Sequence, residues 1–357
     1  MRAIKHIAVF LATLTFFFFL TELFLRGAEI ELSYHSLDPH LGKVIQKDKD
    51  IIMLKEGFYL GKSNEYGYLG PAYPKEKESN IFRIALVGDS YTEGFQLFDK
   101  YHFRSIIENE LNQCSVDSVQ VLNFGSGNFN FHDMYIYYRE FVKEFNPDLL
   151  IFTLKNEDFD RRANYLPAPY PYLENGDIKI NFDFNKTTKF KIYDKLSWIV
   201  ENSSLFKLVL NTYKMATPSN MKKIILGKFY TGFTPEEIER DYSYSERKVF
   251  NLDEINTKII SSLGEEERVM FVHQMTFPDS AARVINNLNV KTFSMNDTLD
   301  VLRQNGIKTN YWKATNQYDH WNHYAHRAVG MYLSKRLCKE LEAIQVASNS
   351  VINNNGD

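Results

Sequence analysis

The strongest hydrophobic signal lies near the N-terminus, where residues 7–25 are almost all apolar. At about 1.5 Å rise per residue, a helix of this length nearly spans a hydrocarbon core of roughly 30 Å. Glu22 interrupts the run near its far end, where a long side chain can reach the interface. We therefore expect residues 1–27 to form a short cytoplasmic stub and a transmembrane anchor.

The charges that flank this run predict its orientation. Arg2, Lys5 and the α-amino group precede it, so the positive-inside bias keeps the N-terminus cytoplasmic and places the remaining chain in the periplasm or outside the cell. A cleavable signal peptide is the alternative, but the small-residue cleavage site that it requires is poor around residues 25–28. The sequence therefore favours an uncleaved anchor.

Beyond residue 80, short apolar runs alternate with helical stretches. Residues 28–80 are polar and rich in turn residues, which predicts a stalk or lead-in. Strands are expected at 82–87, 119–123 and 148–153, with helices at 101–114 and 132–145 between them. This alternation predicts an α/β domain over residues 81–345, in which helices cover both faces of a parallel sheet.

The alternation is interrupted at about 160–250, where proline-rich, aromatic and basic stretches predict an insertion that is helical near 193–213. This insertion could serve as a lid, a glycan groove, a membrane-facing surface or a solvated layer. The pattern resumes with a helix at 252–263, a strand at 269–273 and helices at 296–305 and 322–341. The asparagine-rich tail, 346–357, is expected to be disordered.

Composition narrows the function classes. The chain has 42 basic and 45 acidic residues and a formal net charge of -3, which argues against a general nucleic-acid-binding protein. Its two cysteines, Cys114 and Cys338, form no CxxC pair, so a metal or redox motif is not expected. Two separate thiols and a single disulfide both remain open.

Three segments carry candidate chemistry. Gly88-Asp89-Ser90 follows a predicted buried strand, at the edge of the sheet where α/β proteins bind ligands. The same residues would also suit a simple helix N-cap.

The second candidate is Asp319-His320, which precedes the last predicted helix. An imidazole that a carboxylate orients can take a proton from a serine hydroxyl.

The third candidate is an oxyanion hole at two other strand ends. A backbone N–H in the segment 123–128 and the side-chain amide of Asn156 are suitable donors toward a tetrahedral oxyanion. Each segment alone reads as an ordinary turn between a strand and a helix, but serine, glycine, asparagine and histidine would all meet at one sheet edge.

This order resembles the SGNH (GDSL-like) hydrolase superfamily, whose fold is a three-layer, flavodoxin-like α/β sheet. Residues 84–94, Ile-Ala-Leu-Val-Gly-Asp-Ser-Tyr-Thr-Glu-Gly, look like its first block, and Asn-Phe-Gly-Ser-Gly at 123–127 looks like its second. Asn-Glu-Asp at 156–158 is similar to the third block, and residues 320–326 resemble the fifth. The lead-in at 64–71 is similar to that of membrane-anchored bacterial members, so the resemblance covers roughly residues 64–345, except the insertion.

The resemblance implies roles for individual residues. Ser90 would be the nucleophile, His320 the base and Asp319 the acid, while the oxyanion would be held by Ser90, Gly127 and Asn156. Three departures from the family pattern leave questions open: Lys155 replaces a usual glycine, either Gly127 or Asn128 occupies the key position of the second block, and Asp319 is adjacent to His320. The acid could therefore come from elsewhere, or the site could work as a Ser–His dyad.

The predicted function is a serine esterase that needs no metal or organic cofactor and removes acyl groups from a carbohydrate or lipid of the cell envelope. The alternatives are an O-acyltransferase of exported polysaccharide and a glycan-binding or assembly protein with a decayed site. The acylated glycan or lipid substrate and the membrane are the expected partners.

Overall fold

The computed structural model describes residues 2–27, 34–53, 56–115, 117–160, 168–206, 208–209, 252–266, 268–274, 279–288, 290–315, 317–318 and 320–354. A five-stranded parallel sheet forms the centre of the domain. Its strands in spatial order are β11 (Lys291–Ser294), β10 (Val269–His273), β7 (Leu149–Leu154), β5 (Ile81–Gly88) and β6 (Ser118–Gly125).

Counted along the chain, these strands lie in the order 2-1-3-4-5 when the sheet is read from β6. This is the flavodoxin-like order, in which ligands bind at the carboxyl ends of the strands where the winding direction reverses. The predicted fold class is therefore confirmed. The apolar pattern missed β11, because this edge strand has only four residues and none of them is fully buried.

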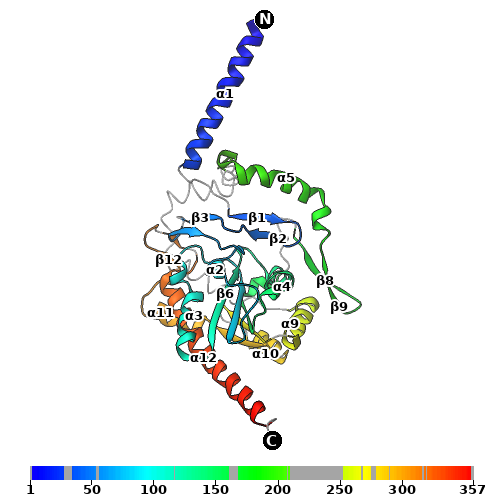
Figure 1. Cartoon of the computed structure of the whole chain (residues 1–357), viewed down its shortest axis with the longest axis vertical. Helices are drawn as coiled ribbons and strands as arrows, with labels where there is room; N and C mark the ends of the chain where they lie inside the picture. The colour runs from blue at the N-terminus through cyan, green and yellow to red at the C-terminus, as the bar shows by residue number, and fades with distance from the viewer. Residues whose placement is uncertain are drawn as a thin grey trace.

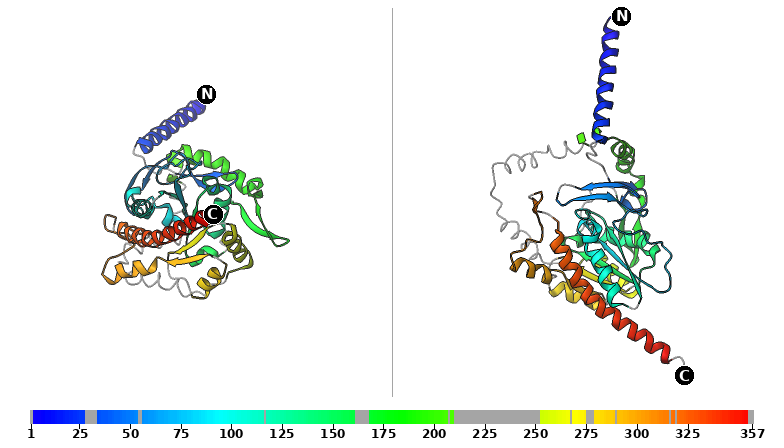
Figure 2. Two further views of the ribbon diagram at one scale, coloured as in Figure 1. Left: turned by 60° about the horizontal axis from the view of Figure 1, so that its bottom comes forward. Right: turned by 60° about the vertical axis from the view of Figure 1, so that its left-hand side comes forward.

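Helices cover both faces of the sheet (Figure 2). One face carries α3 (Phe103–Cys114), α11 (Asn296–Gln304) and α12 (His323–Asn354), and the other carries α4 (Phe131–Glu140), α9 (Glu254–Glu266) and α10 (Asp279–Asn287). Along β5, Ile84 and Leu86 join the hydrophobic core under α3, while Ala85 and Val87 join the core under α4. A strand buried on both faces explains why its sequence is a continuous apolar run.

The segment expected as a stalk folds onto the domain. β1 (His35–Asp38) pairs antiparallel with β2 (Gly42–Ile45), and β3 (Asp50–Met53) pairs with β4 (Tyr59–Lys62). Ile51, Tyr59 and Phe95 are buried in a third hydrophobic cluster that joins this segment to the domain. Four-residue strands are too short for their alternating pattern to stand out in a sequence, so this layer was not predicted.

The described part of the insertion consists of a β-hairpin, a 3₁₀ turn and a helix. β8 (Tyr170–Glu174) and β9 (Asp177–Asn181) form a hairpin, and both residues of its Asn175-Gly176 turn have positive φ, as a tight hairpin requires. A single turn, η4 (Asp183–Lys186), leads into α5 (Thr188–Asn202). The helix expected at 193–213 thus begins earlier, and most of the remaining insertion lies outside the described residues.

The two terminal helices extend from opposite ends of the molecule (Figure 1). By length and composition, the part of α1 (Arg2–Gly27) from Ile4 to Gly27 could cross a membrane. A membrane anchor and a signal sequence both have these properties. α12 continues to Asn354, beyond its expected end at residue 341 and into the segment expected as a tail. Two 3₁₀ turns, η1 (Asp99–Tyr101) and η2 (Val142–Phe145), and the small pair β12 (Tyr311–Trp312) and β13 (Gln317–Tyr318) complete the connections near the sheet.

Cys114 and Cys338 form a disulfide, with Cα atoms 6.1 Å apart. The bond joins the end of α3 to the middle of α12, two helices that pack against each other on one face of the sheet. Of the two possibilities that the sequence left open, the structure therefore has the disulfide. Such a bond is typical of an oxidising compartment.

Because this disulfide joins two residues 224 positions apart in the sequence, the loss of loop-closure entropy predicts that its removal destabilises the protein by about 5 kcal/mol. We expect the double variant Cys114→Ser, Cys338→Ser to unfold at lower denaturant concentration than the wild type. Reductant should shift the wild-type midpoint toward that of the variant and leave the variant unchanged. Two titratable thiols in the unreduced wild type would contradict the pairing.

Candidate active site

Ser90 begins a four-residue helix at the carboxyl end of the central strand β5. This helix, α2 (Ser90–Glu93), follows Gly88 and Asp89 directly. A side chain at Gly88 would lie about 2 Å from the hydroxyl oxygens of Thr92 and Thr153, so only glycine allows α2 and β7 to approach this closely. The sharp turn presents Ser90 at the helix N-terminus, where the partial positive charge of the helix favours a developing anion.

Asp89 holds this turn through three contacts. Its Oδ1 accepts hydrogen bonds from the Tyr91 backbone N–H at 3.0 Å and from Gln274 Nε2 at 3.0 Å. Its Oδ2 lies 2.6 Å from Lys155 Nζ. Lys155 is the residue that departs from the expected glycine, and in this structure it neutralises the buried carboxylate beside the nucleophile. The departure is therefore compatible with the site.

His320 lies next to Ser90, as predicted. Its Nε2 is 2.7 Å from Ser90 Oγ, and its Nδ1 is 2.8 Å from Glu56 Oε2. An ionised carboxylate only accepts hydrogen bonds, so Nδ1 carries the proton and Nε2 presents its lone pair to Ser90 Oγ. This is the tautomer in which the imidazole can take the proton from Ser90.

Glu56 makes the contact with His320 Nδ1 that a catalytic acid would make, for which Asp319 was the candidate from the sequence. Its side chain is buried, and its Oε2 also accepts a hydrogen bond from the His320 backbone N–H at 3.1 Å. Thr315 Oγ1 donates to the Glu56 carbonyl at 2.6 Å, which ties the two loops together. Asp319 itself lies outside the described residues.

The sequence offered no signal that could have found Glu56. It lies 264 positions before His320, in the segment expected as a stalk, between β3 and β4. Only the folding of that segment onto the sheet edge brings its carboxylate to the imidazole.

A second histidine of the same motif has a different role. His326 is 1% exposed on α12, and its Nδ1 accepts a hydrogen bond from the Phe103 backbone N–H at 3.4 Å. Burial, together with the nearby imidazoles of His320 and His323, lowers the pKa of His326 to about 3. It therefore stays neutral and packs in the core, as expected for a structural histidine.

Asn156 also lies at the carboxyl edge of the sheet, as predicted. It follows β7 and begins the turn η3 (Asn156–Phe159), which Asp158 closes by accepting a hydrogen bond from the Lys155 backbone N–H at 2.9 Å. Asn156 is 8% exposed, and neither atom of its amide has a hydrogen-bond partner among the described residues. Because a buried amide without a partner costs free energy, this amide is suited to a ligand oxygen.

The expected role of the Gly127 N–H does not fit the geometry. This group donates to Glu93 Oε1 at 3.1 Å, so it does not point to a substrate oxyanion as a free donor would. The other position left open by the sequence, Asn128, has a left-handed backbone with φ of 67°. No hydrogen bond links the Asn128 N–H to another described residue, so it is the donor of this turn that remains available.

Glu93 lies in a small buried charge cluster behind the nucleophile. His35 Nε2 is 3.0 Å from Glu93 Oε1, and Tyr34 Oη donates to Oε2 at 3.3 Å. Burial alone would raise the pKa of Glu93, but the hydrogen bond and charge of His35, the charge of Lys43 and the Gly127 N–H together lower it. Burial lowers the pKa of Lys43, whose ammonium donates to the Gly127 carbonyl at 2.7 Å.

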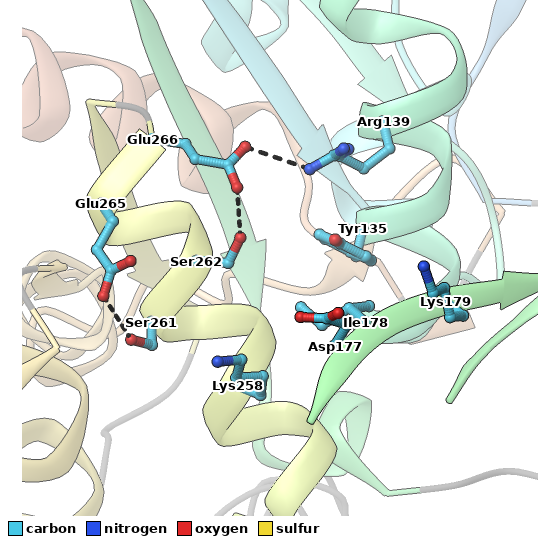
Figure 3. A pocket seen from close by; sticks show the side chains of 10 residues that line it. All are labelled: Tyr135, Arg139, Asp177, Ile178, Lys179, Lys258, Ser261, Ser262, Glu265 and Glu266. Atoms are coloured by element: carbon cyan, nitrogen blue, oxygen red, sulfur yellow. Dashed lines mark hydrogen bonds and ion pairs between the residues drawn. The ribbon is translucent and has the colours of Figure 1, made fainter. Parts of the chain in front are cut away.

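The cavity shown in Figure 3 is not part of this site. It has a volume of about 360 Å³ and is lined from α4, β9 and α9, with Arg139 and Glu266 3.2 Å apart at one side. Its serines donate to glutamates, and no histidine lines it. It therefore lacks a nucleophile paired with a base. Among the described residues, no group of three or more His, Cys, Asp or Glu side chains is placed to hold a metal ion.

Comparison with known proteins finds similarity only at the level of three-dimensional structure. No protein-family model and no curated protein matches the sequence. A lipase/acylhydrolase from Enterococcus faecalis has 11% identity and a TM-score of 0.36, over 72% of this chain and 96% of its own. A carbohydrate acetylesterase from Sinorhizobium meliloti has 11% identity and a TM-score of 0.32, over 72% and 99%. An inhibitor-bound aryl esterase from M. smegmatis has 12% identity and a TM-score of 0.31, over 72% and 98%.

These structural neighbours are lipases and esterases, and they match about 72% of the chain.

The buried charge cluster predicts a pH-dependent stability. Because the folded-state pKa of Glu93 is lowered from 4.5, its stabilisation is present above that value and is lost as pH falls through the folded-state pKa. Glu93→Gln should cost about 3 kcal/mol at pH 7, since it leaves the partners of a buried carboxylate unpaired. Denaturant unfolding of both proteins over a pH series should show the difference shrinking at acid pH.

The matched control is Glu65→Gln, which removes an exposed carboxylate and should change stability little at any pH. A Glu93→Gln deficit that stays constant from neutral to acid pH would contradict the charge cluster.

Proposed function

We propose that this chain is a membrane-anchored serine esterase of the SGNH type, which uses a Ser90–His320–Glu56 triad. The observation that carries the proposal is the chain of contacts from Ser90 Oγ through both imidazole nitrogens to the Glu56 carboxylate, at 2.7 and 2.8 Å. A serine hydroxyl is a poor nucleophile until an oriented base takes its proton. His320 is that base, and Glu56 orients it.

The reaction follows from these positions. Ser90 Oγ attacks the ester carbonyl carbon while its proton moves to His320 Nε2, and Glu56 stabilises the imidazolium. The carbonyl oxygen becomes an oxyanion, for which we propose the Ser90 N–H, the Asn128 N–H and the Asn156 amide as donors. The C–O bond to the alcohol then breaks, and Nε2 returns the proton to the leaving oxygen. Water, activated by the same imidazole, hydrolyses the acyl-enzyme and releases the carboxylic acid.

The location proposed for this chemistry is outside the cytoplasm, at the membrane. The end of α1 is integrated with the folded domain, since Ser203 Oγ donates to Glu22 Oε2 at 2.9 Å and the Ser204 N–H donates to Oε1 at 3.0 Å. These contacts support an uncleaved anchor over a removable signal sequence. The disulfide supports an oxidising compartment. Acylated glycans or lipids of the envelope are therefore the proposed substrates.

The function is tested with the full-length protein in detergent or nanodiscs. Ser90 should react with a fluorophosphonate probe, and acetate should be released from an acetylated polysaccharide at a rate that Ser90→Ala lowers by at least 10³-fold. Transfer of acetyl to an added glycan, in place of acetate release, would identify an O-acyltransferase that uses the same acyl-enzyme. Absence of Ser90-dependent labelling would favour a non-catalytic binding protein and overturn the proposal.

The identity of the acid makes a separate prediction. Glu56→Gln keeps the shape of the side chain but stabilises the wrong imidazole tautomer, so kcat should fall about 10²- to 10⁴-fold with little change in KM. Asp319→Asn is the matched control and should retain most activity. The reverse order of the two variants would assign the acid to Asp319.

A further inference from the structure

α5 presents an apolar face that the rest of the described chain does not cover. Ile192, Leu196 and Ile199 follow one another at helical spacing and are 54%, 39% and 37% exposed. Tyr193 lies on the same side and is 38% exposed. The helix is held to the domain mainly near its start, where the buried Phe190 contacts Phe184. A helix so exposed gains little stability from its own domain.

A tryptophan and three lysines of α5 also suit the boundary between water and lipid. Trp198 is 69% exposed, and an indole prefers the interface because it is apolar with one polar N–H. Lys189, Lys191 and Lys195 are exposed along the same helix. A helix that carries apolar, aromatic and basic side chains in this way is typical of helices that lie flat on a membrane.

The position of α5 places it at the level where such a surface would be. α5 lies crosswise below the base of α1 (Figure 1), and Arg26 of α1 donates to the Asn202 carbonyl at the end of α5. Glu22 of α1 also accepts hydrogen bonds from the residues that follow α5. At about 1.5 Å per residue, Glu22 lies only about 8 Å before the end of α1, which is headgroup depth if α1 spans the bilayer.

We propose that α5 lies on the outer surface of the bilayer and binds anionic lipid, with its apolar side chains in the interface. This inference rests on the proposed membrane anchor. The lysines of α5 favour a negatively charged surface over a neutral one. The contacts of α5 and the residues after it with Glu22 and Arg26 of α1 make a bilayer that α1 crosses the surface beside α5.

The contact would also orient the active site. α5 packs beside β1, and His35 of β1 bonds to Glu93, the last residue of the helix that Ser90 begins. A bilayer-bound α5 would therefore hold the carboxyl edge of the sheet at a constant height and angle to the membrane. Such an arrangement favours substrates whose acyl groups lie close to that surface.

The test uses the fluorescence of Trp198 in the full-length protein, reconstituted in vesicles of phosphatidylcholine and phosphatidylglycerol. The chain has three tryptophans, and the other two, Trp312 and Trp321, are 8% and 4% exposed. Lipids that carry bromine on their acyl chains should quench the fluorescence of Trp198. Acrylamide in the water should quench it less in the wild type than in a control variant whose apolar face on α5 is disrupted and which still contains Trp198. Trp198→Phe should remove the response to brominated lipid.

The control with a disrupted helix is Leu196→Asp, Ile199→Asp, which places two charges on the apolar face. It should lose lipid quenching of Trp198 while vesicle flotation through α1 and fluorophosphonate labelling of Ser90 persist. Strong acrylamide quenching of Trp198 in wild-type vesicles would overturn the proposal. Protection from both quenchers would also overturn it, because protein would then cover α5. In the wild-type protein, failure to float with vesicles would refute the anchor. Absence of Ser90 labelling in the wild type, with flotation and lipid quenching retained, would refute only the esterase function.

Discussion

The hydrogen-bonded chain from Ser90 through His320 to Glu56 is the interaction on which the functional interpretation depends. It joins three distant parts of the sequence: the turn after the central strand, the loop before the last helix, and the turn between β3 and β4. The strand pairs β1–β2 and β3–β4 are called the N-terminal layer below. Each link depends on the others, because the carboxylate fixes the imidazole tautomer and the tautomer leaves a lone pair for the serine. The site thus exists only when the N-terminal layer is folded onto the sheet edge.

Buried charges hold the short helix that carries the nucleophile. At its start, Asp89 is neutralised by Lys155 and bonded to Gln274, and at its end Glu93 is bonded to His35. A four-residue helix has too few internal hydrogen bonds to be stable alone. Its position is therefore determined by these partners, of which Lys155 and Gln274 directly follow β7 and β10 and His35 begins β1. Glu93 also accepts the hydrogen bond of the Gly127 N–H, whereas no described residue pairs with the amide of Asn156. The Gly127 N–H therefore supports the helix, and the Asn156 amide is available to a substrate.

The N-terminal layer connects this site to the end of the molecule that carries α1. β1 contacts α5 on one side and reaches Glu93 on the other, while α5 ends where Glu22 and Arg26 of α1 make their contacts. The segment between the apolar helix and the sheet is therefore a structural unit and not a spacer. With the proposed membrane anchor, this unit would hold the carboxyl edge of the sheet near the membrane.

Much of the fold was readable from the sequence, because each of its signals is local. The apolar runs of β5, β7 and β10 and the Gly-Asp-Ser turn follow from short patterns. The pairing of His320 with Ser90 was expected from the resemblance of their motifs to the SGNH superfamily. Glu56, the available N–H of Asn128 and the disulfide were decided only by tertiary structure. A carboxylate 264 positions from its imidazole has no sequence pattern, since its role depends on where two loops meet. Hydrogen bonding likewise assigns the Gly127 N–H to Glu93, and only the packing of α3 on α12 brings the two cysteines together.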